Sequence, residues 1–234
     1  MDIPPSLTRT AHLFGDATIE RFQRLHILAI GLGAVGGAAV EALARSGIGQ
    51  LTLVDGDVFE ISNLNRQPFA TQSVLGQPKA MVTAEALKAI APTCKTTAIQ
   101  TFITPESVDA LLTRVQPDVV LDAIDDVPAK KALLIQCVQR NLPTWSSMGA
   151  ARKFNPADLR VTDISKTEVC PLARNLRQGL RKAGIQKGIR CVWSKELPSP
   201  HTPGTLGSFM PVTATAGLLL AADILSHFSQ TECL

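Results

Sequence analysis

Three glycines and an aspartate in this chain have the types and spacing of a nucleotide site. Gly31, Gly33 and Gly36 form a G-x-G-x-x-G motif after an apolar run, with Ala34 beside the second glycine. Asp55 follows the second glycine by 22 residues, at the end of the next apolar run. Such a loop turns backbone amides toward a phosphate, and a carboxylate at that distance accepts hydrogen bonds from ribose hydroxyls. This much fits NAD and ATP alike.

The residues after Asp55 favour ATP. Segment 55–67 has no place in a dehydrogenase fingerprint, and Lys79 follows it in the first turn of a predicted helix. The polar residues of that segment include Asp57, Asn63, Asn65 and Arg66. Two cations near a nucleotide stabilise the negative charge of phosphoryl or nucleotidyl transfer, which hydride transfer does not need. An NAD-dependent oxidoreductase remains a rival interpretation.

Alternating strands and helices must position these residues. The apolar runs predict strands over residues 26–31, 50–54, 96–102, 118–123 and 143–147. Helices are predicted over residues 35–46, 78–91, 105–115 and 128–140, with Thr104 as the cap of the third. Alternation at this spacing implies right-handed crossovers. We therefore expect an α/β fold, Rossmann-like and doubly wound, with a mainly parallel sheet.

The character of the chain changes after Gly149. Strands are predicted over 159–164 and 189–194, helices over 171–183 and 213–228, and a loop rich in Pro and Gly over 197–207. Residues 152–195 contain 11 Lys and Arg and 3 acidic residues, a net charge of +8, whereas the rest of the chain carries −5. This basic extension indicates either an anionic partner or solvated helix faces. We expect one domain over 1–234, with a nucleotide-binding core over 1–149 and an extension over 150–234.

Composition and cysteine usage exclude several classes of protein. The chain has 234 residues, 45% of them hydrophobic, so it buries a core without disulfides or a metal. No apolar run has the length of a membrane span and the N-terminus lacks a signal pattern, so a cytoplasmic protein without membrane contact is expected. The cysteines form no Cys-x-x-Cys pair, which argues against a disulfide framework and a four-thiolate zinc site. They are Cys94, Cys137, Cys170, Cys191 and Cys233.

Several of these motifs together resemble a known family. The glycine motif, the strand-end aspartate, S-N-L-N-R-Q, G-Q-P-K and the acidic segment 120–126 are similar to the adenylating family of ThiF, MoeB and ubiquitin-activating enzymes. The resemblance spans about residues 9–149. It implies ATP held by the glycine loop and Asp55, and Mg²⁺ at Asp125 beside Asp126. It also implies that Asn63, Arg66 and Lys79 contact the phosphates.

The resemblance implies a homodimer as well. The family supplies an N-terminal arginine to the partner's ATP, and Arg9 in R-T-A-H-L-F-G matches it. The family pattern usually reads G-x-G-G-x-G, so Ala34 is a departure from it. Because Ala tolerates positive φ less well than Gly, a strained geometry at residue 34 would weaken phosphate binding.

The C-terminal half resembles one branch of that family. Segments 147–151, 158–168, 171–174 and 191–196 are similar to tRNA threonylcarbamoyladenosine dehydratases. This branch uses ATP to activate the threonyl carboxylate of a modified adenosine beside the anticodon, and the activated group then cyclises. The basic extension suits such a substrate, because Lys and Arg neutralise RNA phosphates.

Three alternatives stay open at this point. One is adenylation of a ubiquitin-like sulfur carrier, although the paired zinc cysteines common in such enzymes are absent. Cys170 and Cys191 are then the candidates for a reactive thiol, and a sulfur-transfer partner protein is neither indicated nor excluded. The others are the NAD-dependent oxidoreductase and a non-catalytic tRNA-binding module.

Overall fold

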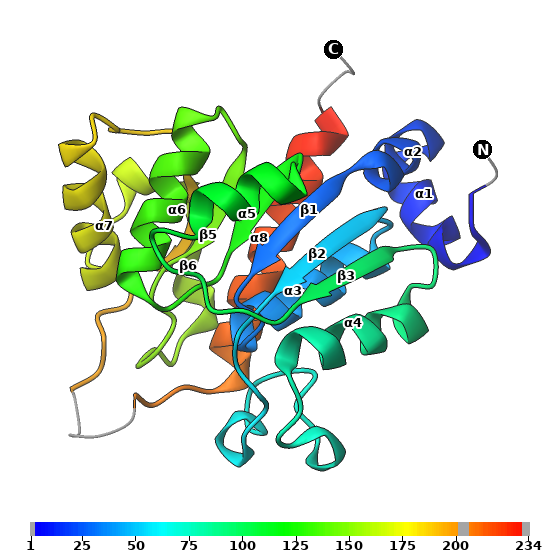
Figure 1. Cartoon of the computed structure of the whole chain (residues 1–234), viewed down its shortest axis with the longest axis horizontal. Coiled ribbons are helices and arrows are strands. Elements are labelled where there is room, and N and C mark those ends of the chain that lie inside the picture. Colours follow the sequence, from blue (N-terminus) through cyan, green and yellow to red (C-terminus); the bar gives the residue numbers. More distant parts are fainter. Residues whose placement is uncertain (1–2, 201–205, 231–234) are drawn as a thin grey trace.

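A single seven-stranded sheet organises the molecule (Figure 1). The computed structural model describes residues 3–200 and 206–230. The strands are β1 (His26–Ile30), β2 (Gln50–Val54), β3 (Lys95–Ile99), β4 (Val119–Asp122), β5 (Thr144–Ser147), β6 (Leu159–Asp163) and β7 (Arg190–Ser194). Their order is β3-β2-β1-β4-β5-β7-β6, and only the β6–β7 pair is antiparallel. The predicted α/β, Rossmann-like, mainly parallel architecture is confirmed.

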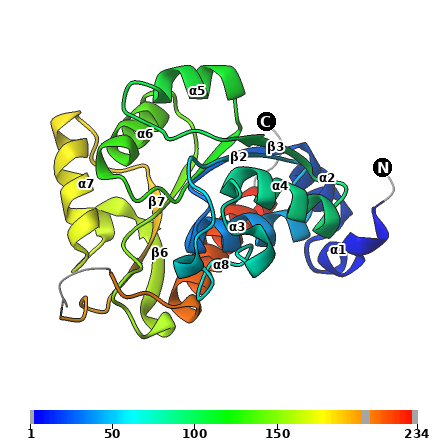
Figure 2. The same ribbon diagram turned by 60° about the horizontal axis from the view of Figure 1, so that its bottom comes forward.

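Helices cover both faces of the sheet (Figure 2). One face carries α3 (Ala34–Arg45), α4 (Lys79–Ile90) and α8 (Met210–Gln230). The other carries α5 (Val108–Val115), α6 (Val127–Gln139) and α7 (Pro171–Lys182). Two further helices, α1 (Thr8–Phe14) and α2 (Asp16–Arg24), precede the sheet. Short 3₁₀ turns lie at Pro5–Leu7, Ile61–Asn63, Gln72–Val74, Pro156–Asp158 and Ile164–Lys166.

The central strands are apolar on both sides because each side meets helices. In β1, Ile27 and Ala29 join the cluster beneath α3 and α8, while Leu28 and Ile30 join the cluster beneath α5 and α6. Successive side chains of a strand point to opposite faces, so a strand covered on both faces reads as a continuous apolar run. This pattern explains why the parallel strands were recognisable in the sequence.

Helix α8 completes the core by packing against α3. A Cβ on Gly217 would lie 2.3 Å from the carbonyl oxygen of Val35, so this glycine permits the close approach of the two helices. By length and composition α8 would qualify as a membrane span, with 44% of the qualifying window buried inside the molecule. Its apolar character is accounted for by eight buried residues that face the core. The extension predicted after residue 149 thus supplies both β6–β7 and this core helix.

Several predicted boundaries were wrong, and α1 and α2 were not predicted. The helix expected from residue 105 begins at Val108, because residues 104–107 form a turn in which the Thr104 N–H donates to Ser107 Oγ. The strand expected to reach residue 102 ends at Ile99, and α8 begins three residues earlier than expected. Residues 201–205 of the expected loop, and Cys233, lie outside the described residues.

Candidate nucleotide site

The glycine loop joins β1 to α3 through two positions that exclude side chains. Gly31 has φ of 88°, and a Cβ there would lie 2.6 Å from the carbonyl oxygen of Ala123. A Cβ on Gly36 would lie 1.8 Å from the carbonyl oxygen of Gly31. The first glycine therefore brings the loop against the end of β4, and the third lets α3 begin directly beneath it.

Gly33 and Ala34 form the entry to α3. Gly33 is the residue before the helix, and Ala34 is its first helical residue with an ordinary negative φ. Alanine at position 34 therefore introduces no strain, and the condition under which this departure from the family pattern would weaken phosphate binding is not met. The first amides of a helix lack internal partners, so they are free to face an anion.

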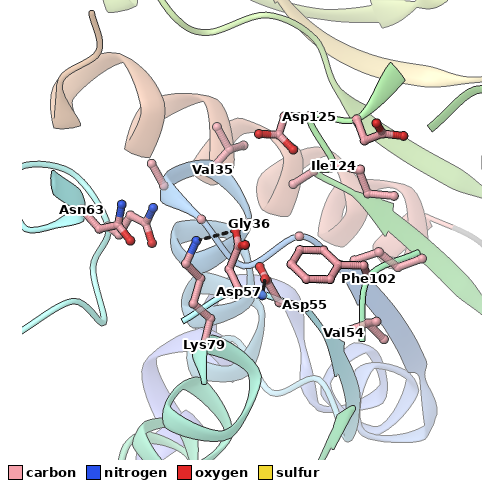
Figure 3. A pocket seen from close by; sticks show the side chains of 18 of the residues that line it. Val35, Gly36, Val54, Asp55, Asp57, Asn63, Lys79, Phe102, Ile124 and Asp125 are labelled. Carbon is pink, nitrogen blue, oxygen red and sulfur yellow. Dashed lines mark hydrogen bonds and ion pairs between the residues drawn. The ribbon is translucent and has the colours of Figure 1, made fainter. Parts of the chain in front are cut away.

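Asp55, which follows β2, holds the glycine loop in place through hydrogen bonds. Its carboxylate accepts hydrogen bonds from the N–H groups of Leu32, at 2.6 Å, and Asp57, at 2.8 Å. Burial raises the pKa of Asp55 above its ordinary value, while these two donors oppose that rise. Asp57 Oδ2 pairs with Lys79 Nζ at 3.0 Å, and Figure 3 shows this contact across the cleft floor. Lys79 is the first residue of α4 and its side chain is buried. The ion pair with Asp57 holds its ammonium group at the site.

Asn63 and Arg66, in the segment after Asp57, are positioned by different hydrogen bonds. Asn63 is buried, and its Oδ1 accepts from the Glu60 N–H at 3.1 Å. Arg66 donates to the carbonyl of Ser62 at 2.8 Å and to Asn65 Oδ1 at 2.9 Å. Asn65 itself donates to the carbonyl of Ser208 at 3.0 Å. Asn65 thus supports Arg66 rather than facing the cleft.

Two adjacent carboxylates after β4 have separate tasks. Asp126 caps α6, since its Oδ1 accepts from the Ala129 N–H at 2.8 Å. Asp125 is exposed and its side chain has no hydrogen bond or ion pair within the described part of the chain. Helix capping is therefore the role of Asp126, and the carboxylate of Asp125 takes no part in it.

A buried ion pair lies beneath this acidic loop. Lys130 Nζ and Asp122 Oδ2 are 2.8 Å apart, and both side chains are 0% exposed. Lys130 also donates to the carbonyl of Ile124 at 3.0 Å, and Asp122 accepts from the Ile124 N–H at 3.1 Å. Ser146 Oγ donates to Asp122 at 2.6 Å. The network fixes the backbone just before Asp125.

These residues surround one cleft of about 460 Å³ at the carboxyl edge of the strands. In Figure 3, Asn63 and Lys79 face Asp125 across the glycine loop. The predicted residues that line the cleft are Gly31, Gly33, Ala34, Gly36, Asp55, Asp57, Asn63, Arg66, Lys79, Asp125 and Asp126. Asn65 and Arg9 are the two predicted residues outside this lining; Arg9 is exposed on α1.

Sequence reasoning missed two lining residues with binding capacity. Gln67 contributes to the cleft lining, and its buried Oε1 has no hydrogen-bond partner among the described residues. Phe102 is an exposed ring on the cleft wall near Asp55 (Figure 3). The Q of S-N-L-N-R-Q was part of a recognised motif and pointed to the first, whereas nothing in the sequence pointed to the second.

Neither candidate cysteine lies in the cleft. Cys170 and Cys191 are both buried in the cluster between α6 and α7. Burial raises the pKa of Cys191 to about 12, so this thiol is protonated at neutral pH. A thiolate is the reactive form, and Cys191 is therefore poorly suited to covalent chemistry in this conformation.

The fold and the cleft define the class of Rossmann-like α/β proteins with a glycine loop at the sheet's switch point. More narrowly, the chain belongs to the ThiF family, whose model matches residues 7–233. It is 39% identical over 205 residues to the tRNA threonylcarbamoyladenosine dehydratase of Escherichia coli, covering 84% of this chain and 76% of that protein.

A solved structure agrees with this relationship. The crystal structure of the E. coli tRNA N6-threonylcarbamoyladenosine dehydratase in complex with ATP superposes with a TM-score of 0.91, at 36% identity and 97% coverage of both chains. The sulfur carrier protein ThiS adenylyltransferase of E. coli is more distant, at 28% identity over 94% of this chain and 80% of that protein.

Proposed function

We propose that this chain is an ATP-dependent tRNA threonylcarbamoyladenosine dehydratase, which adenylates the carboxylate of the modified adenosine and lets it cyclise. The observation that carries the proposal is the match over 97% of both chains to a dehydratase solved with ATP. The cleft supports it, because its glycine loop, buried Lys79 and nearby Arg66 suit a triphosphate.

Different lining residues contact the ribose, the adenine and the phosphates of the nucleotide. Asp55 accepts from the ribose hydroxyls, and Phe102 offers a flat surface to the adenine. The amides after Gly33, together with Asn63, Arg66 and Lys79, hold the phosphates. Gln67 lines the same cleft, and its buried Oε1 lacks a donor, which costs free energy that an ordered water would recover.

Asp125 is the residue that fits Mg²⁺. Magnesium in nucleotide sites is held by one or two carboxylates plus phosphates and water, and Asp125 offers an uncommitted carboxylate at the cleft. When bound there, the ion would neutralise charge on the phosphate oxygens. Asp126 contributes less, because its carboxylate is already engaged in capping α6.

The reaction proceeds in two substitutions. A carboxylate oxygen of the substrate attacks the α-phosphorus of ATP, and the bond to the bridging oxygen breaks to release pyrophosphate. Arg66 and Lys79 stabilise the charge that develops on the phosphates. An atom of the threonylcarbamoyl group then attacks the acyl carbon, and AMP leaves as the ring closes. Positioning and electrostatics suffice, so no side-chain nucleophile is needed.

Isotope exchange between labelled pyrophosphate and ATP tests this function. We expect exchange to depend on tRNA that carries threonylcarbamoyladenosine, and Arg66→Ala to abolish it while the fold is retained. Exchange that instead requires a carrier protein ending in Gly-Gly would establish the sulfur-carrier alternative. Unchanged tRNA modification by Arg66→Ala would point to a non-catalytic tRNA-binding module, and NADH binding without ATP binding to an oxidoreductase.

We propose further that the enzyme is a cytoplasmic homodimer in which Arg9 acts on the partner's ATP. Arg9 is exposed and lies outside the cleft lining of its own chain, as a residue acting in trans would. Mixing Arg9→Ala with Arg66→Ala tests this arrangement, because each mixed dimer contains one intact site. Recovery of about a quarter of wild-type activity is expected for a twofold dimer. No recovery between two inactive variants would exclude action in trans.

A further inference from the structure

An exposed aromatic pair lies outside the cleft, where α8 meets the segment after β5. Phe154 is 68% exposed and Phe209 is 37% exposed. Their ring centroids are 6.5 Å apart, with the planes tilted by 46°. The chain has only 4% aromatic residues, so two of them placed together at the surface are not explained by core packing.

The backbone that presents Phe154 is held by a dedicated polar network. The carboxylate of Glu196 accepts from the N–H groups of Phe154 and Asn155, each at 3.0 Å. Lys153 is buried, and its ammonium group donates to the Glu196 carbonyl. Burying an ammonium group is costly unless its donors are satisfied. The ring is therefore displayed on a fixed support.

The pair is tied to the proposed phosphate site by a short series of contacts. The Arg152 N–H donates to the Gly207 carbonyl at 2.8 Å, so the two ring-bearing segments run beside each other. Ser208, next to Phe209, accepts from Asn65, and Asn65 in turn accepts from Arg66 at 2.9 Å. The aromatic surface and the catalytic arginine thus share one rim of the molecule.

We propose that Phe154 and Phe209 form a stacking site for an unpaired nucleobase of the RNA substrate. Unstacked bases in RNA loops are recognised by aromatic faces, and stacking accepts any base. Arg152 precedes Phe154 by two residues, and Arg66 is linked through Asn65 to Ser208, the residue before Phe209. Two cations therefore belong to or contact the segments that present the rings, which favours a polyanion over an apolar partner surface. The site would hold a base near the reacting adenosine, and so deepens the proposed function on which it rests.

Binding of an anticodon stem-loop RNA to Phe154→Ala tests the stacking site. Base–aromatic stacking measured by alanine substitution corresponds to a loss of about 5- to 150-fold in affinity. Phe154→Trp retains an aromatic face and is expected to bind like the wild type, whereas Phe154→Leu is expected to resemble Phe154→Ala. Binding of ATP, and of a fully paired RNA duplex, is expected to be unchanged by all three. Met81→Ala, at an exposed residue of α4, is the matched control.

Two results would overturn the stacking site. One is unchanged stem-loop affinity in Phe154→Ala; the other is a fall in oligomeric mass, which would make the pair an interface between copies of this chain. The proposed function fails separately: stem-loop binding that depends on Phe154, without RNA-dependent pyrophosphate exchange, would retain the stacking site and remove the dehydratase.

Discussion

At the scale of single residues, Asp125 is the carboxylate whose environment leaves it free for chemistry. We predict that Asp125→Asn lowers the rate of pyrophosphate exchange about 100-fold, because the charge proposed to hold Mg²⁺ is lost. Its free energy of unfolding should change by less than about 0.5 kcal/mol, since the side chain is exposed and makes no contact that folding needs. Parallel measurement of exchange and urea unfolding checks both parts.

Asp126→Ala is the matched variant, and its expected effect is on stability. Loss of the cap on α6 should cost about 1 kcal/mol, because the Ala129 N–H loses its acceptor. A large stability loss in Asp125→Asn and none in Asp126→Ala would reverse the two assignments.

Cys191 yields a second prediction at this scale. A thiol with a pKa of about 12 holds almost no thiolate at neutral pH, and burial blocks access as well. Iodoacetamide should therefore leave the Cys191 peptide unlabelled in the native enzyme and label it after unfolding in urea, as peptide mass mapping would record. Rapid native labelling would revive the reactive-thiol interpretation.

Several of the residues predicted from sequence come directly after apolar strands. Gly31, Asp55 and Asp125 follow three buried strands, and the carboxyl ends of parallel strands meet at one edge. Residues whose contribution depends on packing gave no such signal. Lys130 lies inside the predicted helix 128–140 and Phe102 at the end of the predicted strand 96–102. Only the fold places them beside the acidic loop and the cleft.

At the scale of elements, α6 is tied to the end of β4 by the buried pair of Lys130 and Asp122. We predict that Lys130→Met lowers the free energy of unfolding by about 3–5 kcal/mol, because Asp122 is left buried without a counter-charge. The double variant Asp122→Asn/Lys130→Met should regain most of that stability, since no uncompensated charge remains. Urea unfolding of both variants and the wild type provides the measurement.

The same double variant separates positioning from stability. If the network orients the acidic loop, pyrophosphate exchange should stay low even where stability is regained, because Lys130 no longer holds the Ile124 carbonyl. Full exchange in a stable double variant would reduce the pair to a structural role.

Elements and their boundaries were mispredicted where the local pattern was short or ambiguous. Helix α2 buries Ile19 and Phe22, yet its seven-residue neighbour α1 is too short to show a clear period, and neither helix was predicted. Pro105 favours a helix start, but the turn at Ser107 delays it to Val108. Apolar periodicity, together with Gly or Pro at the ends of elements, located the sheet strands and most helices within a few residues.

At the scale of the whole molecule, the charge of +8 over residues 152–195 is less available than the count implies. Lys153 is buried, Arg190 pairs with Asp223, and Arg177 donates to Thr167. The cations that remain exposed on one helix are Arg174, Arg181 and Lys182 of α7. The composition argument thus located a basic region but not the subset of it that can meet an anion.

The three exposed cations of α7 give the last prediction. Each Lys or Arg that neutralises an RNA phosphate releases counterions, so the triple variant Arg174→Gln/Arg181→Gln/Lys182→Gln should reduce the slope of log affinity for tRNA against log salt by about 2–3. The control changes three cations that already pair with glutamates on their own helices: Arg24→Gln, Arg45→Gln and Lys88→Gln. We expect the control to leave the slope nearly unchanged and both variants to bind ATP normally. Equal slopes for the α7 variant and the wild type would place the tRNA on another face.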